Sequence, residues 1–375
     1  MTDKRIYQIG LTMIEGVGDV LARQLLEVLG DAEAVFVEKP RLLEKVPGIG
    51  KTIATKERRD KALSLAEKEL AFVEKNHIAL YFLTDADYPK RLFECPDAPV
   101  LFYFKGNADL NAARVISVVG TRRATAYGQE QTEHLLNELS RSFPDLLVVS
   151  GLAYGIDICA HRSALKCQLP TVGVLAHGLD RIYPPVHRAT AVEMLAHGGL
   201  LTDFPMDTNP DRQNFVRRNR IVAGLADAII VVESAEKGGS LITADLALSY
   251  GRDIFTFPGR VTDPRSKGCN ALIRQNKAGL ITCAEDLILS MRWDVASQTQ
   301  ALPQQAQLLF SENQEGNRVL ELLIAHKEMH INELALSLDL PIQQLSPILF
   351  ELEVDGKIKS MPGGNYKVDY AGIKG

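Results

Sequence analysis

Residues 114–128 read RVISVVGTRRATAYG, an apolar, largely β-branched run that stops at Gly120 and Thr121 and passes into a helical pattern. A buried strand that ends in a glycine turn and leads into a helix is the repeating unit of a doubly wound α/β domain. Backbone N–H groups at a helix start lack an intrahelical partner, and glycine lets an anion approach them closely. The stretch therefore predicts both a fold class and an anion-binding turn.

Two further glycine turns have the same layout. They read VSGLAYGIDICAH from Val149 and GGSLITADLA from Gly238, and a basic box, FVRRNRIVAGL, begins at Phe215. Because ligands of doubly wound sheets bind beyond the carboxyl ends of the strands, we expect the three turns to meet there. Three such turns beside several arginines indicate a ligand with several phosphates.

The apolar runs extend this pattern to a whole domain. Strand candidates begin at Ala79, Val100, Arg114, Leu146, Thr171, Leu200, Ala228 and Asp253. Most of the later ones do not alternate with polar residues, which is typical of a parallel sheet covered on both faces. We predict an α/β domain over residues 77–291, an extended Rossmann-like doubly wound fold with a mostly parallel sheet.

The segment before this domain, residues 1–76, has a helical pattern with an internal near-repeat. The repeat places a Gly-apolar-Gly turn ahead of a helix at Gly16–Gly18 and again at Gly48–Gly50. The turns resemble tandem helix-hairpin-helix motifs of a SAM-like domain, which hold DNA backbone phosphates without reading sequence. The alternative is an αα-hairpin whose glycines only serve the turn.

The segment after the domain divides into two parts. Residues 292–313 are polar and rich in glutamine, and we predict a linker there. Residues 314–375 show three helical patterns followed by the hairpin-like KSMPGGNYKV, which is the outline of a winged helix. Its presumed recognition helix, from Ile342, offers Gln343, Gln344 and Ser346 but no lysine or arginine before Lys357. A protein contact is at least as consistent with this helix as duplex reading.

Composition limits the classes of function. The net charge of −5 and the pI near 6.0 exclude a protein that coats nucleic acid with its whole surface, so any such site is local. The five cysteines form no CxxC pair, which argues against a disulfide framework or a zinc site. No signal-peptide h-region and no membrane-length apolar run occurs, and we expect a reduced, cytoplasmic protein without metal or cofactor.

The first two turns supply candidate phosphate ligands. Arg122 can clamp a phosphate that the amides of Gly120 and Thr121 already hold, although an ordinary surface arginine is the simpler alternative. Tyr154 stands between Gly151 and Gly155, where a base or a sugar could rest on its ring, or where the ring could simply pack in the turn. Asp157 and His161, four residues apart, fit capping and orienting roles, because no nucleophile accompanies them.

The basic box and the third turn complete the candidate site. The box combines positive charge with an aromatic ring, as single-stranded nucleic acid requires, and it consists of Arg212, Phe215, Arg217, Arg218, Asn219 and Arg220. A solvated helix face is the alternative. Lys237, Gly239 and Ser240 form the third turn, a kind of loop that also holds phosphates in small-molecule enzymes.

At this point the chain resembles a known family. The strings VGTRRATAYG, VSGLAYGIDICAHRSAL, GLDRIYPPVHR, FVRRNRIVAGL and GGSLITADLALSYGRDIFTFPG, in this order, are similar to the DNA processing protein A family (DprA, also called Smf). The resemblance spans residues 81–291 and departs from the family pattern at two positions. Tyr154 stands where several members have a basic residue, and Val216 stands where a proline is usual.

The resemblance implies a non-enzymatic recombination mediator. Members bind single-stranded DNA without sequence specificity, form homodimers and load the RecA recombinase onto the strand during natural transformation. Carried over by position, the contacts are Gly120, Thr121, Arg122, Gly151, Gly155, Arg212, Phe215, Arg218, Asn219, Arg220, Lys237, Gly239 and Ser240.

Two other functions remain open at this stage. One is a nucleotide hydrolase of the phosphoribohydrolase kind, whose Gly-Gly loop also cradles a phosphate. Such enzymes carry a catalytic glutamate just after that loop, where this chain offers only Asp245. The other is a duplex-binding regulator led by the winged helix, and the low basic content of its recognition helix counts against it.

Overall fold

The computed structural model describes residues 3–50, 55–293, 314–361 and 364–368. The chain forms two compact units, residues 1–293 and 294–375, which are described separately below. The first contains the helical segment and the α/β domain, and the second contains the winged helix. The predicted linker falls almost wholly on residues 294–313, outside the described residues.

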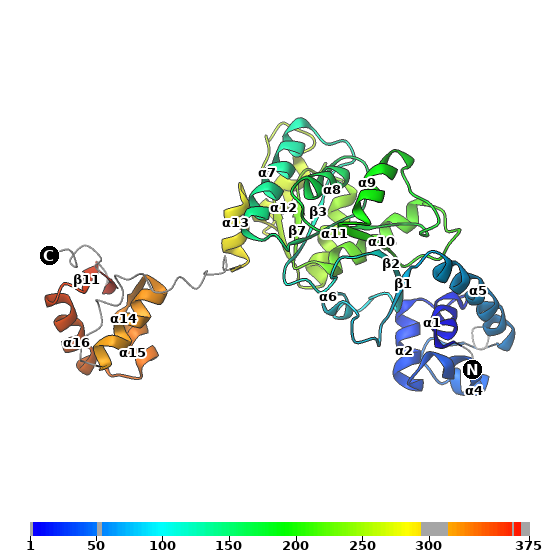
Figure 1. Ribbon diagram of the computed structural model, residues 1–375, viewed down its shortest axis with the longest axis horizontal. Coiled ribbons are helices and arrows are strands. Elements are labelled where there is room, and N and C mark those ends of the chain that lie inside the picture. Colours follow the sequence, from blue (N-terminus) through cyan, green and yellow to red (C-terminus); the bar gives the residue numbers. More distant parts are fainter. Residues whose placement is uncertain (1–2, 51–54, 294–313, 362–363, 369–375) are drawn as a thin grey trace. The chain divides into compact units, whose positions relative to one another are not determined.

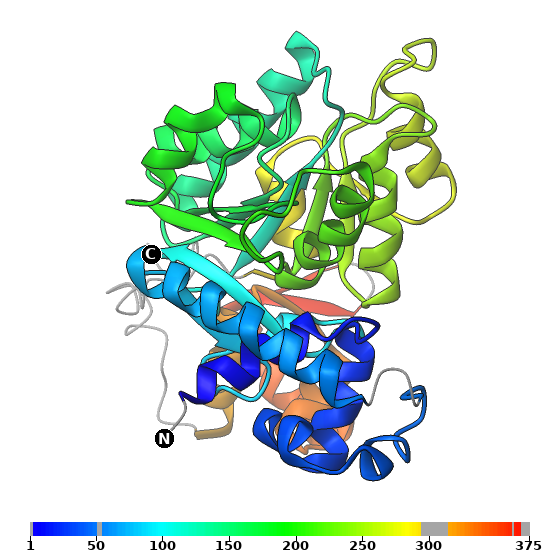
Figure 2. The ribbon, with the colours of Figure 1, turned by 90° about the vertical axis from the view of Figure 1, so that its right-hand side faces the viewer.

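The first unit begins with helices and continues into a large sheet. The helices are α1 (Lys4–Met13), α2 (Asp19–Leu29), α3 (Ala32–Val37), α4 (Pro40–Leu43) and α5 (Lys56–Lys75). Figure 1 shows α1, α2 and α5 beside strands β1 and β2, and the turned view of Figure 2 shows the same placement at that edge of the sheet. One continuous apolar core runs from Ile9 of α1 through Phe82 of β1 to Val231 of β7. The change from helices to sheet near residue 76 is therefore not a break in packing.

The described sheet of this unit has nine strands in the order β1-β2-β6-β5-β4-β3-β7-β8-β9. Strands β3 to β9 run parallel, and β2 pairs antiparallel with both β1 and β6. The strands are β1 (Ala79–Phe82), β2 (Leu101–Gly106), β3 (Val115–Val119), β4 (Leu147–Ser150), β5 (Thr171–Val174), β6 (Gly198–Thr202), β7 (Ala228–Val231), β8 (Asp253–Thr256) and β9 (Gly279–Leu280). The predicted doubly wound, mostly parallel fold is confirmed.

Helices cover both faces of this sheet. Alternate residues of β3 belong to different cores: Ile116 and Val118 pack with α7 and α8, whereas Val115 and Val119 share the core of α10 and α11. Burial on both faces is why the strands read as unbroken apolar runs. The helices after β1 are α6 (Lys90–Phe93), α7 (Ala126–Ser142), α8 (Ile156–Lys166), α9 (Arg188–Met194), α10 (Arg212–Leu225), α11 (Gly239–Ser249), α12 (Lys267–Arg274) and α13 (Ala284–Ser290), with a 3-10 turn, η1, at Pro185–His187.

The second unit has its own small core. Its elements are α14 (Gln314–His326), β10 (Glu328–His330), α15 (Ile331–Leu338), α16 (Ile342–Val354), β11 (Ile358–Met361) and β12 (Asn365–Val368). The strands pair antiparallel in the order β10-β12-β11. Leu320, Leu334, Leu345 and Leu349 pack together between the helices. This is the predicted winged helix, with a β-hairpin after three helices.

Candidate nucleic-acid interface

The glycine turns after β3, β4 and β7 meet at one edge of the sheet. The Thr121 amide donates to the Glu233 carbonyl at 2.8 Å, and the Ile156 amide donates to the Thr121 carbonyl at 3.1 Å. Gly155 has a φ of +79° and lies so close to the Thr121 carbonyl that a Cβ there would overlap it. Successive strands from β3 to β6 are added on one side of β3, whereas β7 to β9 are added on its other side. This edge is therefore the topological switch point, where doubly wound folds bind ligands.

Arg122 projects from the first turn over an aromatic ring of α10. Its guanidinium carbon lies 4.9 Å from the Phe215 ring centroid, within cation–π range. Arg122 is exposed, Phe215 is half-buried, and Arg122 forms no ion pair within the described parts of the chain. The structure thus brings together an open cation and an aromatic ring that lie far apart in the sequence.

Arg218 lies beneath the second turn. It is only 3% exposed, its Nη1 donates to the Val174 carbonyl at 2.8 Å, and a Cβ on Gly151 would overlap its guanidinium. Burial lowers the pKa of Arg218 to about 10, although Asp157 opposes that shift, so the guanidinium stays charged at neutral pH. The prediction that Arg218 touches a phosphate stays untested, but its position is that of a buried cation under the turn.

Asp157 and His161 hold the floor of this turn. The Asp157 carboxylate accepts the Gly151 N–H at 3.2 Å. The Thr171 hydroxyl donates to the Val148 carbonyl, so its 2.8 Å contact with His161 Nδ1 must be a donation from the histidine. Burial, with the positive charge of Arg218, lowers the pKa of His161 to about 3 and keeps the ring neutral. These contacts fit the expected orienting roles.

Two exposed tyrosines flank Phe215 and the second turn. Tyr154 is 48% exposed, and its ring lies 5.1 Å from that of the buried His187, whose Nδ1 contacts the Leu152 carbonyl at 2.9 Å. Tyr183 is 42% exposed and lies 6.0 Å from the Phe215 ring. Reasoning from the sequence missed Tyr183. Its place within GLDRIYPPVHR, a string that also carries the family resemblance, was the available signal.

The third turn divides between outward and inward groups. Lys237 and Gly239 are exposed at the start of α11, and no atom would meet a Cβ on Gly239. Ser240 is buried, and its hydroxyl donates to the Ser234 hydroxyl at 2.9 Å. Lys237 and Gly239 are thus open to a ligand, whereas the Ser240 side chain belongs to the framework of the turn.

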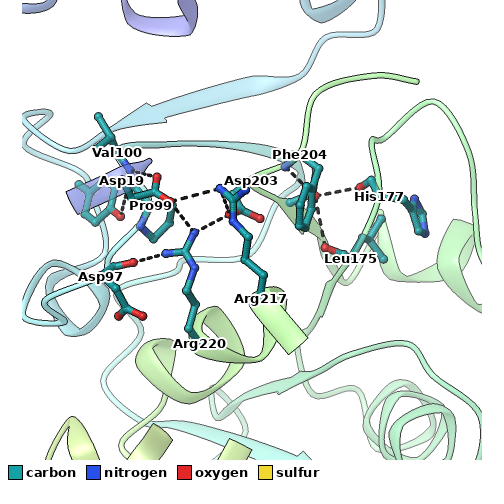
Figure 3. A network of polar contacts seen from close by, with 12 residues as sticks. Asp19, Asp97, Pro99, Val100, Leu175, His177, Asp203, Phe204, Arg217 and Arg220 are labelled. Carbon is teal, nitrogen blue, oxygen red and sulfur yellow. Dashed lines mark hydrogen bonds and ion pairs between the residues drawn. The ribbon is translucent and has the colours of Figure 1, made fainter. Parts of the chain in front are cut away.

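The remaining residues of the basic box point to different surroundings. Arg220 is buried on the side of α10 that faces the N-terminal helices, where its Nη2 lies 3.0 Å from Asp19 and 2.5 Å from Asp203 (Figure 3). Its Nη1 donates to the Asp97 carbonyl. Arg217 shares the two carboxylates at 3.2 and 3.3 Å and is half-exposed. Arg212 opens α10 and is exposed, and Asn219 is half-buried.

Comparison with known proteins gives the same architecture a family. The family model described as DNA recombination-mediator protein A matches residues 79–292. The chain belongs to the DprA/Smf family. The DprA winged helix domain matches residues 303–364, which confirms the interpretation of the second unit.

Relatives agree with this placement. Protein Smf of Synechocystis is 34% identical over 299 residues, 77% of this chain and 73% of the relative. The DNA processing protein DprA of Bacillus subtilis is 41% identical over 206 residues, 55% of this chain and 68% of the relative. The X-ray structure of DprA from Streptococcus pneumoniae superimposes with a TM-score of 0.66 at 31% identity, covering 77% of this chain and 98% of that one.

A second solved DprA structure bears on the ligand. It is the Helicobacter pylori protein, described in a study of its single-stranded DNA binding mode. It superimposes with a TM-score of 0.52 at 29% identity, covering 58% of this chain and 96% of that one. A DNA processing role is thereby shown for the family to which this chain belongs.

The first glycine turn of the N-terminal segment, at Gly16–Gly18, faces the α/β domain. Asp19, the first residue of α2 after Gly18, accepts the Val100 N–H at 3.1 Å and binds both Arg217 and Arg220. The carboxylate at this helix start is therefore used in a contact between segments. For the second turn, Gly48 and Gly50 are described but residues 51–54 are not. DNA contact by either turn stays a prediction.

The winged helix exposes several apolar side chains on α15 and α16. On α16, Phe350 is 68% exposed and Val354 is 70% exposed, and Leu336 of α15 is 83% exposed. Gln343 and Gln344 of α16 are also exposed, and this helix carries no lysine or arginine. An exposed surface of α16 with apolar and amide side chains and no cation fits a protein contact better than the phosphates of a duplex.

The described residues contain neither a cluster of metal ligands nor a membrane-length helix. No cluster of three or more histidine, cysteine, aspartate or glutamate side chains there could hold a metal ion. No helix in the described part is both long and apolar enough to cross a membrane.

Proposed function

We propose that this protein binds single-stranded DNA without sequence preference and loads the RecA recombinase onto it during natural transformation and recombination. The observation that carries the proposal is the open Arg122 guanidinium over the Phe215 ring, at the edge where the glycine turns meet. Membership of a recombination-mediator family and the single-stranded DNA binding of the Helicobacter pylori relative support it.

The chemistry follows from the two kinds of group at this edge. Arg122, Arg212 and Lys237 are exposed cations for phosphates, and the open turn at Gly239 lets the backbone approach. The Thr121 N–H, expected to hold a phosphate, instead donates to the Glu233 carbonyl, so the first turn contributes mainly Arg122. Phe215 and Tyr154 offer rings on which any base can stack. Because phosphates and ring faces are common to all nucleotides, such a site binds without sequence preference.

The buried residues of the site act from below in this proposal. Arg218 places positive charge beneath the Gly151 turn, and Asp157 fixes the turn's amide. Asn219 follows Arg218 on α10, and the Ser240 hydroxyl holds the third turn together. Arg220, already bound to two carboxylates, contributes to the framework rather than to the strand.

RecA loading and homodimer formation rest on the family resemblance. The exposed apolar side chains of α15 and α16 are compatible with a protein contact but do not identify its partner. Light scattering of the purified chain tests for the dimer. The rate at which RecA hydrolyses ATP on a single-stranded oligonucleotide, with and without this protein, tests the loading.

The hydrolase alternative gains no support from the third turn. Asp245, the first acidic residue after the loop, lies within α11, is exposed and pairs with Lys277 at 2.9 Å. A carboxylate bound to a surface lysine is poorly placed to act on a nucleotide at the start of that helix. We therefore propose a binding protein without a cofactor.

Fluorescence anisotropy tests the proposed binding directly. A labelled oligo-dT and its matched duplex are titrated with the protein across a salt series. We expect tighter binding to the single strand, with affinity falling steeply as salt rises, because each phosphate contact adds about −0.7 to the slope of log K against log salt. Equal weak binding to both would contradict the proposal, and release of free base from a nucleoside monophosphate would favour the hydrolase.

A further inference from the structure

The loop between β5 and η1 carries an aromatic side chain that the proposed function leaves unused. The loop contains residues 178–184 of GLDRIYPPVHR, and Tyr183 near its end is 42% exposed. In the described residues, the Tyr183 hydroxyl has no hydrogen-bond partner. A large ring that is half in water and without a polar anchor is not explained by core packing.

The backbone of this loop is held firmly. The Tyr183 N–H donates to Nε2 of His177 at 3.2 Å, and Nδ1 of the same ring donates to the Gly178 carbonyl at 2.8 Å. His177 is 1% exposed, and burial lowers its pKa, so the neutral tautomer that makes both bonds is retained. The histidine fixes the position from which the Tyr183 ring projects.

A second attachment joins the loop to the segment before α10. Arg181 donates to Asn209 at 2.8 Å and pairs with Asp180 at 2.8 Å and with Asp207 at 3.5 Å. The cation of the loop is thus already neutralised by carboxylates. The loop therefore offers a ligand an aromatic ring rather than positive charge.

The Tyr183 ring stands beside the proposed strand-binding groups. Its centroid is 6.0 Å from that of Phe215, with the planes tilted by 60°, and Phe215 lies under Arg122. The tilt shows that the two rings do not stack face to face on each other. Directly after the loop, His187 of η1 packs against the ring of the exposed Tyr154. The loop and η1 thus place one exposed tyrosine beside Phe215 and contact another, Tyr154, in the second turn.

We propose that Tyr183 is a further base-stacking residue, so that neighbouring bases of a single strand stack on Tyr183 and on Phe215 while Arg122 binds the phosphate. This rests on the proposed single-stranded DNA binding. Base-to-ring stacking involves no exchange of counterions. Tyr183 should therefore strengthen binding without adding to its salt dependence, unlike Arg122.

The test compares Tyr183→Ala and Tyr183→Phe with the wild type. Each full-length protein is titrated with labelled oligo-dT and with an abasic oligonucleotide of the same length, across a salt series. We expect Tyr183→Ala to weaken oligo-dT binding about tenfold to hundredfold, as loss of one stacked base does. The salt slope and the binding of the abasic strand should not change, and Tyr183→Phe should bind like the wild type because the ring is retained.

Other outcomes separate the two proposals. Loss of affinity for the abasic strand, or a smaller salt slope, would show that the substitution disturbs the phosphate contacts and would overturn the stacking role. Tyr183→Ala that binds oligo-dT as the wild type does would overturn it alone. A wild type that fails to bind oligo-dT would overturn both the stacking role and the proposed function. Thermal unfolding of each variant serves as the folding control.

Discussion

Arginines on two faces of α10 have different roles. On one face, Arg217 and Arg220 share the carboxylates of Asp19 and Asp203, which come from the N-terminal helices and from the end of β6. On the other face, Arg218 lies under the Gly151 turn, and its guanidinium carbon is 5.9 Å from the centroid of the Phe215 ring. The exposed Arg122 lies over the same ring. The number of arginines in a basic stretch is therefore a poor guide to the number of phosphate contacts.

The energetics of the two faces differ accordingly. A buried guanidinium with two carboxylates is costly to break, because removal of one partner leaves a charge unpaired in a low dielectric. An exposed guanidinium over a ring costs little to remove from the folded protein but is available to an anion. We therefore expect the first face to determine stability and the second to determine binding.

The largest effect is expected at Arg220. Arg220→Ala leaves Asp203, whose side chain is 1% exposed, without its 2.5 Å partner, and should lower the free energy of unfolding by about 3–5 kcal/mol. Urea denaturation measures this. The matched control, Arg217→Ala, removes a half-exposed side chain and should cost about 1 kcal/mol or less. Equal losses would show that the two arginines are not distinguished by burial.

A smaller effect is expected at Gly151. Gly151→Ala forces a methyl group into the space of the Arg218 guanidinium, and overpacking of this kind costs about 1–3 kcal/mol. The displaced guanidinium should also weaken oligo-dT binding. Gly239→Ala is the control for stability, because no atom lies within reach of its Cβ. A Gly151→Ala protein as stable as the wild type would contradict the placement of Arg218.

These expectations show what the sequence reveals and what it conceals. Eight strands could be predicted from apolar runs, because a strand that is buried on both faces of the sheet has consecutive apolar residues. The two-residue, exposed β9 left no such run. Asp19 and Arg220 form an ion pair although they are 201 residues apart, and a local sequence pattern cannot predict a partner at that separation.

The candidate site divides in the same way. The glycine turns, Arg122 and Phe215 could be predicted as site residues from the sequence, because each lies in a short motif of its own. The burial of Arg218 and Ser240 was not, because it depends on the packing of β5 and of the third turn. Tyr183 could not be predicted as a site residue, because a single tyrosine in a proline-containing loop has no distinctive pattern and its proximity to Phe215 depends on the fold.

Acid should act on the floor of the site through His161. Its pKa is about 3 in the folded chain and 6.5 ordinarily, so between these values the unfolded chain binds more protons and stability falls as pH falls. One pH unit below 6.5 this amounts to about 1 kcal/mol. His161→Gln should remove this contribution, measured as the difference in unfolding free energy from the wild type at pH 7.5 and 5.5.

Comparing the variant with the wild type is necessary because a second buried group changes stability with pH in the opposite direction. Burial raises the pKa of Glu69 to about 7, so in the folded chain it takes up a proton as pH falls from 7 and stabilises the protein. Both proteins in the comparison retain Glu69. An identical pH dependence for His161→Gln and the wild type would show that His161 is not kept neutral by burial.

The smallest effect is expected at Lys237, an exposed cation at the start of α11. Lys237→Ala should weaken oligo-dT binding about two- to fivefold and reduce the salt slope by about 0.7, with no change in stability. Lys277→Ala is the matched control, because Lys277 is paired with Asp245. A similar change in both variants would indicate a general charge effect rather than a contact at the turn.

The most direct measurement compares Arg122→Ala with Arg217→Ala in one anisotropy salt series on oligo-dT. Both substitutions remove one positive charge. Arg122 packs over Phe215 on the side of α10 that faces the glycine turns, whereas Arg217 pairs with Asp19 and Asp203 on its other side. We predict that Arg122→Ala weakens binding about tenfold and lowers the salt slope by about 0.7, whereas Arg217→Ala leaves both near the wild type. Equal losses in the two variants, or a loss with Arg217→Ala alone, would contradict the division between a binding face and a stabilising face.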